Sequence, residues 1–408
     1  MAQDASRHLK VRTVPTVPPV LGVWCLVPVL VLVPVLAPVL TLRAITYAQA
    51  PVLTGVVESD FGSGRQIKGL VALAVGDTTV DKRFVIRMPG QTRRWNGSLV
   101  IGAHGGGGGN NFDRSGNVIG TDETALDDVI GHRAMVAGFA YASFDRDGGG
   151  NGLDGLRLTY QFTDIAKAEV ERRGGRGTAR VYLVGLSAGG GITRLAAEDA
   201  AAKYAGTLII AGAGGDLVTR LDKQTRMAAL WPLIDPQAHF GIPDNDPKIL
   251  AYAEAIGTPV EARRLWPYTG AGAVAAAARP QTAVETITGR LRVPTIEVAG
   301  TWDDLVIREL RVYEQRAAPP ARHRLYQVEG VWHMSSDDDG VLSFQYLATS
   351  RMKLDPDVAN AMREGPSYLP TVREAFDHLV RWVEHGTPPP ASQIVKPGAP
   401  LRLDIIKR

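Results

Sequence analysis

The 408-residue sequence predicts an α/β fold, with a mostly parallel sheet that has helices on both of its faces. Two observations predict this fold: short apolar runs that end in glycines, and longer segments with helical spacing between those runs. Parallel strands need a crossover of a dozen or more residues, so strands that alternate with helices imply a parallel sheet. The composition, 45% hydrophobic and 21% charged, is ordinary for a globular protein and excludes disorder of the whole chain.

The elements follow one another along the chain in the order that this fold requires. Apolar runs predict strands at residues 70–75, 84–88, 98–103, 139–145, 180–185, 207–214, 294–300 and 324–330. Apolar positions at helical spacing predict helices at residues 121–138, 156–172, 188–204 and 306–316. Each predicted helix lies between two predicted strands, so the sheet is built from repeated crossovers.

One long segment, residues 216–290, breaks the alternation. It contains Trp231, Trp266, several prolines and an alanine-rich stretch, and it separates two predicted strands. We expect it to form helices inserted as a cap or lid over a pocket. Together with the leader described next, this gives two parts: residues 1–50, and one domain at 51–408 that carries the insertion.

The first 50 residues differ in character from the rest of the chain. Basic residues precede an apolar run at 20–42, and the small-x-small sequence that ends at Ala50 follows it. This is the layout of a secretory signal peptide, so we expect cleavage after Ala50 and a secreted or periplasmic protein without membrane contact. The alternative is an uncleaved membrane anchor, because about twenty apolar residues suffice to span a bilayer.

Charge and cysteine content exclude several classes of partner and site. The leader holds four basic and one acidic residue, and removing them from the totals of 45 and 42 leaves 41 of each. The mature chain therefore offers no electrostatic case for nucleic acid. Cys25, in the leader, is the one cysteine of the sequence, so the mature chain has no disulfide, thiol nucleophile or cysteine metal site.

The sequence GLSAG, with Ser187 at its centre, satisfies the G-x-S-x-G pattern. It lies between a predicted strand and a predicted helix, which is the context that this pattern requires. The flanking glycines Gly185 and Gly189 allow a sharp turn that exposes the hydroxyl above the sheet. We therefore expect Ser187 to be a nucleophile, although the pattern also arises by chance in glycine-rich chains.

A serine nucleophile needs a base, and the base needs a carboxylate to hold it. Asp303 follows the strand at 294–300 and is the preferred acid, with Asp304 and then Asp216 as alternatives. His333 lies 30 residues beyond Asp303, after the last predicted strand, and is the preferred base. Its position in the chain is the reason for preferring it, because the other histidines do not follow the carboxyl end of a strand after the acid.

The glycine run that begins after His104 follows another predicted strand. Glycines allow backbone N–H groups to approach a negatively charged oxygen, so Gly105 and Gly106 are expected to form an oxyanion hole together with Ala188. The lysine and hydroxyl of a nucleotide-binding loop are absent, and His104 is interpreted as an anchor for the loop. The acidic run at 145–156 lacks the final glutamate of a calcium loop, so no metal and no cofactor are expected.

Taken together, the strand order and the motifs HGGG, GLSAG, GTWDDLV and VEGVWH resemble the α/β-hydrolase superfamily over residues 98–333. The resemblance implies an eight-stranded sheet, a serine nucleophile, and ester hydrolysis through an acyl-enzyme. The carboxyl-terminal sequence AFDHLVRWVEHGTPPPAS is similar to the closing helix of secreted tannase and feruloyl-esterase-like hydrolases. Those proteins usually have cysteines beside the serine and the histidine, whereas this sequence has Leu186 and Met334.

These expectations combine into a secreted carboxylic-ester hydrolase with Ser187, His333 and Asp303 as its catalytic triad, acting on a small-molecule or polymeric ester. Two alternatives stay open: a secreted peptidase or amidase of the same fold, and a non-catalytic binding protein built on a hydrolase scaffold. A dehalogenase would need aspartate at position 187 and is excluded. The sequence does not identify the acyl or alcohol group, because the pocket depends on the placement of the cap.

Overall fold

The structure is a computed structural model. It describes residues 53–90, 94–105, 110–112, 118–146, 152–201, 203–212, 288–303, 317–331 and 365–402. The predicted leader, the cap except for its last three residues, and the predicted helix at 306–316 lie outside the described residues. Within the described part of the chain, no helix has both the length and the apolar character needed to cross a membrane.

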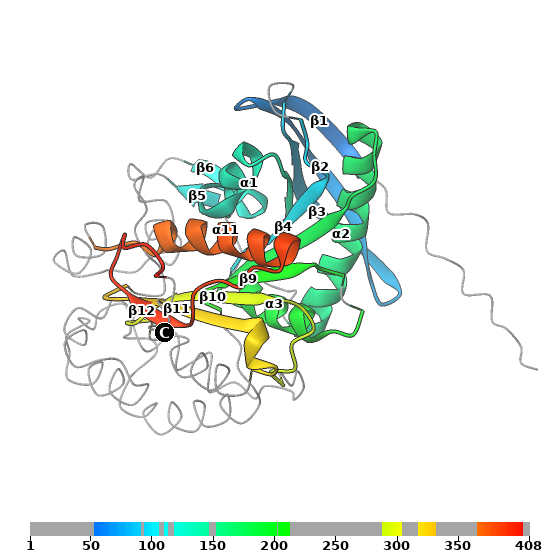
Figure 1. The fold of residues 1–408 in the computed structure, drawn as a ribbon. Helices are drawn as coiled ribbons and strands as arrows, with labels where there is room; N and C mark the ends of the chain where they lie inside the picture. The colour runs from blue at the N-terminus through cyan, green and yellow to red at the C-terminus, as the bar shows by residue number, and fades with distance from the viewer. Residues whose placement is uncertain are drawn as a thin grey trace, which may run out of the picture. The chain divides into compact units, whose positions relative to one another are not determined.

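Ten strands of the described residues form one mixed sheet (Figure 1). From β7 to the β12 edge every neighbouring pair is parallel, whereas the pairs from β1 to β7 are antiparallel. The predicted α/β class with a mostly parallel sheet is therefore confirmed. In sheet order the strands are β1 (Leu53–Phe61), β2 (Gly64–Val75), β3 (Thr78–Met88), β7 (Ala140–Phe144), β4 (Ser98–Ala103), β8 (Arg180–Leu186), β9 (Gly206–Ile210), β10 (Thr295–Gly300), β11 (His323–Val328) and β12 (Gln393–Val395).

The sheet has two strands more than the eight that were expected, one at each edge. Strand β1 pairs only with β2, and seven of its nine residues are exposed. Strand β12 is three residues long and pairs only with β11. The eight strands between them include every predicted strand. A separate two-stranded sheet, β5 (Asn110–Phe112) with β6 (Val118–Thr121), follows the glycine run.

Helices cover both faces of the sheet and enclose a core on each (Figure 1). The helices α2 (Gly152–Gly174) and α3 (Ala188–Glu198) pack on one face, where Phe162 and Ile192 belong to the same buried cluster as Leu99 and Ile101 of β4. The short helices η1 (Asp122–Thr124), η2 (Asp127–Gly131) and α1 (His132–Val136), with α11 (Leu369–His385), pack on the other. Because side chains alternate along a strand, Val100 of β4 faces that second core.

Three of the predicted helices have different limits in the structure, and the one predicted at 156–172 is α2, which spans Gly152–Gly174. Residues 121–138 form three short helical pieces rather than one helix. Helix α3 ends at Glu198 and not near Tyr204, because Asp199 takes an extended conformation with φ of −67° and ψ of 133°. Its carboxylate accepts hydrogen bonds from the Ala201 N–H (3.0 Å) and the Tyr160 hydroxyl (2.7 Å), and these contacts hold the chain out of the helix.

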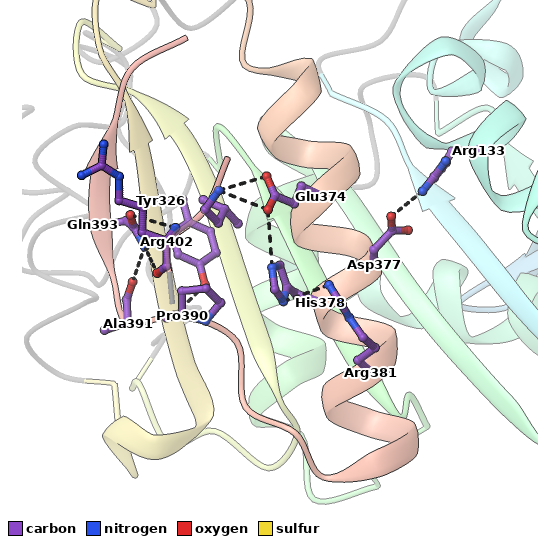
Figure 2. A network of polar contacts seen from close by, with 11 residues as sticks. Arg133, Tyr326, Glu374, Asp377, His378, Arg381, Pro390, Ala391, Gln393 and Arg402 are labelled. Carbon is purple, nitrogen blue, oxygen red and sulfur yellow. Dashed lines mark hydrogen bonds and ion pairs between the residues drawn. The ribbon is translucent and has the colours of Figure 1, made fainter. Parts of the chain in front are cut away.

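The carboxyl-terminal segment is fastened to α11 and β11 by polar contacts (Figure 2). The carboxylate of Glu374 on α11 accepts the Leu401 N–H at 3.1 Å, and the Tyr326 hydroxyl of β11 donates to the Pro390 carbonyl at 2.7 Å. On the other side of α11, Asp377 pairs with Arg133 of α1. The contacts of Tyr326 and Glu374 flank β12 on both sides in the chain and help to hold it against β11, the strand that precedes His333.

A buried ion pair joins α3 to β10. The guanidinium of Arg194 donates two hydrogen bonds of 2.9 Å to the carboxylate of Glu297, and both side chains are almost fully buried. The ring nitrogen Nε2 of His323 lies 3.7 Å from the same carboxylate. Burial disfavours the charged carboxylate, but Arg194 and His323 outweigh it and lower the pKa of Glu297 from 4.5 to about 2.

Replacing Arg194 with methionine is expected to lower the free energy of unfolding by about 3–5 kcal/mol, because it leaves the Glu297 carboxylate buried without its cation. Denaturant unfolding at pH 7 measures this change. The matched control is Arg172→Met, which removes an ion pair with Glu169 from an arginine that is 64% exposed, and should cost less than about 1 kcal/mol. Equal losses of unfolding free energy in the two variants would contradict the conclusion that Arg194 neutralises a buried carboxylate.

The same ion pair predicts a loss of stability in acid. The pKa of Glu297 is lower in the folded chain than in the unfolded chain, so its contribution is complete above about pH 4.5 and is lost as the pH falls toward 2. The difference amounts to about 3 kcal/mol. Unfolding measured between pH 5 and pH 2 should show this slope in the wild type, and Glu297→Gln should lack that part of it.

Candidate functional site

Ser187 lies at the sharp turn between β8 and α3, with φ of 53° and ψ of −118°. A positive φ is uncommon in a residue other than glycine, and such strained positions cluster at functional sites. Several hydrogen bonds hold the turn: the Ser187 N–H donates to the Ile210 carbonyl (2.9 Å), and the Gly190 N–H donates to the Ser187 carbonyl (2.8 Å). The predicted strand-turn-helix context of the G-x-S-x-G pattern is present.

The two outer glycines of this pattern are required by the close approach of other atoms. A Cβ atom at Gly185 would lie 2.1 Å from the Thr193 hydroxyl oxygen and 2.3 Å from the Gly189 carbonyl oxygen. A Cβ atom at Gly189 would lie 1.9 Å from the Ala103 carbonyl oxygen. Only glycine fits at either place, so the spacing G-x-S-x-G follows from the packing of Gly185 against α3 and of Gly189 against the end of β4.

Gly105 lies beside the Ser187 side chain. Ala103 at the end of β4 pairs with Gly185 of β8, so the residues two positions further along the two chains come together. A Cβ atom at Gly105 would be 3.1 Å from Ser187 Cβ and 3.7 Å from Ser187 Oγ. Ala188 is the first residue of α3, and the first N–H groups of a helix have no acceptor within it. Gly106 lies outside the described residues.

Asp303 lies in the loop that follows β10, and its side chain is fully buried. The loop is joined to the loop after β11: the Trp302 N–H donates to the Val331 carbonyl (3.1 Å), and the Gly330 N–H donates to the Thr301 hydroxyl (3.0 Å). A Cβ atom at Gly300 would lie 1.7 Å from the Val331 carbonyl oxygen, so the two loops are in backbone contact. His333, the predicted base, comes two residues after Val331 in the chain.

The strand register places these loops on one edge of the sheet. Leu186 of β8 pairs with Ile210 of β9, and Ile210 pairs with Val298 of β10. All three strands are parallel, so Ser187 and Asp303 both follow carboxyl ends that meet at the same edge. His333 and the alternative acids Asp304 and Asp216 lie outside the described residues.

His104 anchors the chain between β4 and the glycine run, as the sequence suggested. Its Nε2 accepts the Arg146 N–H at 2.9 Å, so the proton is on Nδ1, which donates to the Gly105 carbonyl at 2.9 Å. The Arg146 guanidinium, through Nη2, donates to the carbonyl oxygens of His104 and Gly105, the latter at 3.0 Å. Sequence reasoning did not single out Arg146. The one feature that could have indicated its role is that this charged residue directly follows the predicted strand at 139–145.

The carboxylates near His104 belong to a charge network. Among the described residues, His104, Asp122 and Asp145 each bring one potential metal-ligand atom within 4.8 Å of the others. Both ring nitrogens of His104 already have hydrogen-bond partners, and Asp145 accepts from Arg83 at 2.7 Å. Burial lowers the pKa of Arg146 to about 10, while the charges of Asp122 and Asp145 oppose this change. The two carboxylates therefore suit the guanidinium groups of Arg83 and Arg146 better than a metal ion.

Comparisons with known proteins add to this picture. No curated protein is similar enough in sequence to count as a match. Solved structures similar to this chain include an esterase and feruloyl esterase B, both from Aspergillus oryzae. The esterase is 11% identical over 84% of this chain and 88% of its own, with a TM-score of 0.48. Feruloyl esterase B is 12% identical over 86% and 90%, with a TM-score of 0.45. Vibralactone cyclase is 14% identical over 80% and 83%, with a TM-score of 0.45.

Residues 249–400 match the sequence model of a family described as an alpha/beta hydrolase domain. This match and the order and direction of the strands in the sheet together indicate the fold. From β2 to β11 the strands lie in the sheet in chain order, except that β7 and β4 are exchanged. The turn at Ser187 follows β8, in the middle of this sheet. The chain has the α/β-hydrolase fold.

Proposed function

We propose that this chain is a secreted serine hydrolase that cleaves carboxylic esters. In this proposal His333 takes the proton of Ser187, Asp303 holds the imidazole, and water later frees the acyl group from the serine. The observation that carries the proposal is the strained turn at Ser187, which is tightly packed at Gly185 and Gly189 and has Gly105 beside the serine side chain. A positive φ in a non-glycine residue at a sharp turn between a strand and a helix suits a serine nucleophile.

Further support comes from the surroundings of the serine. Gly105, Gly106 and Ala188 are proposed to donate N–H groups to the negatively charged oxygen of the tetrahedral intermediate. Gly105 contacts Ser187, and Ala188 begins the helix. Asp303 is buried at the same sheet edge, in a loop bonded to Val331. The proposed mechanism uses the side chains of Ser187, His333 and Asp303, these backbone N–H groups, and water.

The experiment that tests this function is a substrate panel with the purified wild type and Ser187→Ala. The panel contains p-nitrophenyl esters of increasing acyl length, aryl esters, a polyester, and aminoacyl anilides as the amide comparison. We expect hydrolysis of one or more esters by the wild type and none above background by the variant. Hydrolysis of the anilides in preference to the esters would contradict the ester proposal, and activity that survives in Ser187→Ala would contradict the nucleophile.

The choice of acid gives a separate prediction. Asp303→Asn is expected to lower kcat for the best ester by about 10⁴-fold, because the amide no longer holds the imidazole in the useful tautomer. The neighbouring Asp304→Asn is the matched control and should change kcat little. Steady-state kinetics on both variants check this. A large loss in Asp304→Asn with an active Asp303→Asn would transfer the role of the acid to the neighbour.

Export is the remaining part of the proposal. We expect the apolar run at 20–42 to direct the chain across a membrane, and the mature protein to begin at Pro51. Expression of the full chain in a bacterial host, followed by fractionation and amino-terminal sequencing, measures this. A chain that stays in the membrane fraction with residues 1–50 attached would support the anchor instead.

A further inference from the structure

The Arg146 side chain is buried behind the loop that carries Gly105, and it does not itself belong to the proposed triad. It follows β7, is 1% exposed, and reaches across to the end of β4. Its Nη2 donates to the carbonyl oxygens of two consecutive residues, His104 and Gly105. Burying a cation costs free energy unless the cation is paired, so the buried position of Arg146 indicates a role besides packing.

The contact with the His104 carbonyl fixes the orientation of the peptide group between His104 and Gly105. In a trans peptide the C=O of one residue and the N–H of the next point in opposite directions. The cis peptide bond found among the described residues is Ala318–Pro319, so the His104–Gly105 bond is trans. Because Arg146 holds the His104 carbonyl, the Gly105 N–H is directed away from Arg146. The carbonyl of Gly105 is held on the same side by Arg146 and by the His104 ring at 2.9 Å.

The charge of Arg146 also acts on these peptide groups. A hydrogen bond from an ionised donor is stronger than a neutral one, and it polarises the group that accepts it. A carbonyl that accepts from a guanidinium therefore belongs to a peptide whose N–H is a better donor on its opposite side. The negative charges of Asp122 and Asp145 favour the charged guanidinium, and Arg83 is hydrogen-bonded to Asp145 in turn.

We propose that Arg146 is a positioning residue that sets the oxyanion hole, by holding the carbonyls of His104 and Gly105 so that the Gly105 N–H is presented beside Ser187. This inference rests on the proposed function. His104 is the second part of the same device, because its ring joins the Arg146 backbone to the Gly105 carbonyl. Arg146 therefore acts indirectly: it holds the loop, and the Gly105 N–H of the loop contacts the reacting oxygen.

The test compares Arg146→Lys, Arg146→Met and a control, Arg133→Met. Lysine keeps the charge opposite Asp122 and Asp145, so that variant is expected to fold, but its single ammonium is a poorer match for two carbonyls than the planar fork. Methionine fills the space without a donor. Arg133 is an exposed partner of Asp377 on the α1 side of α11 and lies outside the proposed site (Figure 2).

The kinetic readout is kcat per active site, with the sites counted by complete reaction with a fluorophosphonate, so that unfolded protein does not enter the value. We expect kcat to fall about 100-fold in Arg146→Met, as for the loss of one oxyanion-hole donor, and by a smaller factor in Arg146→Lys. KM should change little, and the inhibition constant of a trifluoromethyl ketone, which forms an oxyanion, should rise as kcat/KM falls.

The outcomes separate this inference from the proposed function. A wild type that hydrolyses no ester contradicts the proposed function and with it this role for Arg146. An active wild type whose Arg146 variants keep the wild-type kcat per titrated site contradicts the inference alone, even if their melting temperatures fall, because Arg146 would then serve folding. Reduced kcat with weakened ketone binding, and an unchanged Arg133→Met, supports it.

Discussion

Replacing Ser187 with alanine is expected to lower kcat for ester hydrolysis by about 10⁶-fold, the loss that removal of a serine nucleophile produces. The reason is chemical: without the hydroxyl, no acyl-enzyme forms, and only the binding of substrate and the oxyanion donors stay in place. The turn should persist, since the glycines at 185 and 189 and the backbone bonds to Ile210 do not involve the hydroxyl. Steady-state kinetics with the best ester of the panel measures the effect.

The matched control for this variant is Ser59→Ala. Ser59 lies on the exposed edge strand β1, where its hydroxyl accepts a hydrogen bond from Gln66, and its loss should leave kcat unchanged. Melting temperatures of both variants should stay near that of the wild type. A Ser187→Ala protein that is folded and retains more than about a hundredth of the wild-type rate would contradict the nucleophile, because a catalytic serine contributes far more.

The second large effect is expected at Gly189. In Gly189→Ala the new methyl group would be placed 1.9 Å from the Ala103 carbonyl oxygen and 2.6 Å from the His104 carbonyl oxygen. Both are backbone atoms that cannot rotate away, so β4 and α3 must separate. We expect a loss of more than about 4 kcal/mol in the free energy of unfolding, or failure to fold. Denaturant unfolding and the yield of soluble protein measure this.

Gly177→Ala is the control for that substitution. A Cβ atom at Gly177 meets no atom within 4 Å, and the residue has no positive φ, so the change in stability should stay within about 1 kcal/mol. If Gly189→Ala does fold, the shift of the Ala103–His104 backbone should still lower kcat by displacing Gly105 from Ser187. A Gly189→Ala protein with wild-type stability and kcat would show that the turn is not packed as described.

The turn at Ser187 could be predicted from the sequence because its cause is local. Two glycines at fixed distance from the serine, a β-branched run before it and a helical pattern after it are all visible in fifteen residues. The contacts that Gly185 and Gly189 make explain why the pattern is so short. Asp303 was predicted as the acid by a different kind of argument, from the order of strand ends, and the structure places this residue buried at the same sheet edge.

The parts that sequence reasoning missed depend on contacts between distant segments. Strand β1 has mostly exposed side chains, so it shows no apolar run, and its pairing with β2 decides its conformation. Strand β12 follows a proline-rich stretch that is typical of a loop, and it becomes a strand by pairing with β11. The end of α3 at Glu198 depends on Tyr160, 39 positions away from Asp199.

Arg146 illustrates the same limit within the site. In the sequence it appears in a run of acidic and glycine residues with the loose spacing of a calcium loop, and nothing local marks it as buried. Its burial follows from the pairing of β7 with β4, which brings its side chain under His104, 42 positions earlier in the chain. A pattern read along one segment does not contain that information.

The most direct measurement is the identification of the residue that a fluorophosphonate modifies in the wild-type protein, by digestion and mass spectrometry of the labelled peptides. Our account predicts one adduct per chain, on Ser187, with ester hydrolysis lost in proportion to labelling. Labelling of another residue, or full labelling at Ser187 that leaves ester hydrolysis intact, would contradict it.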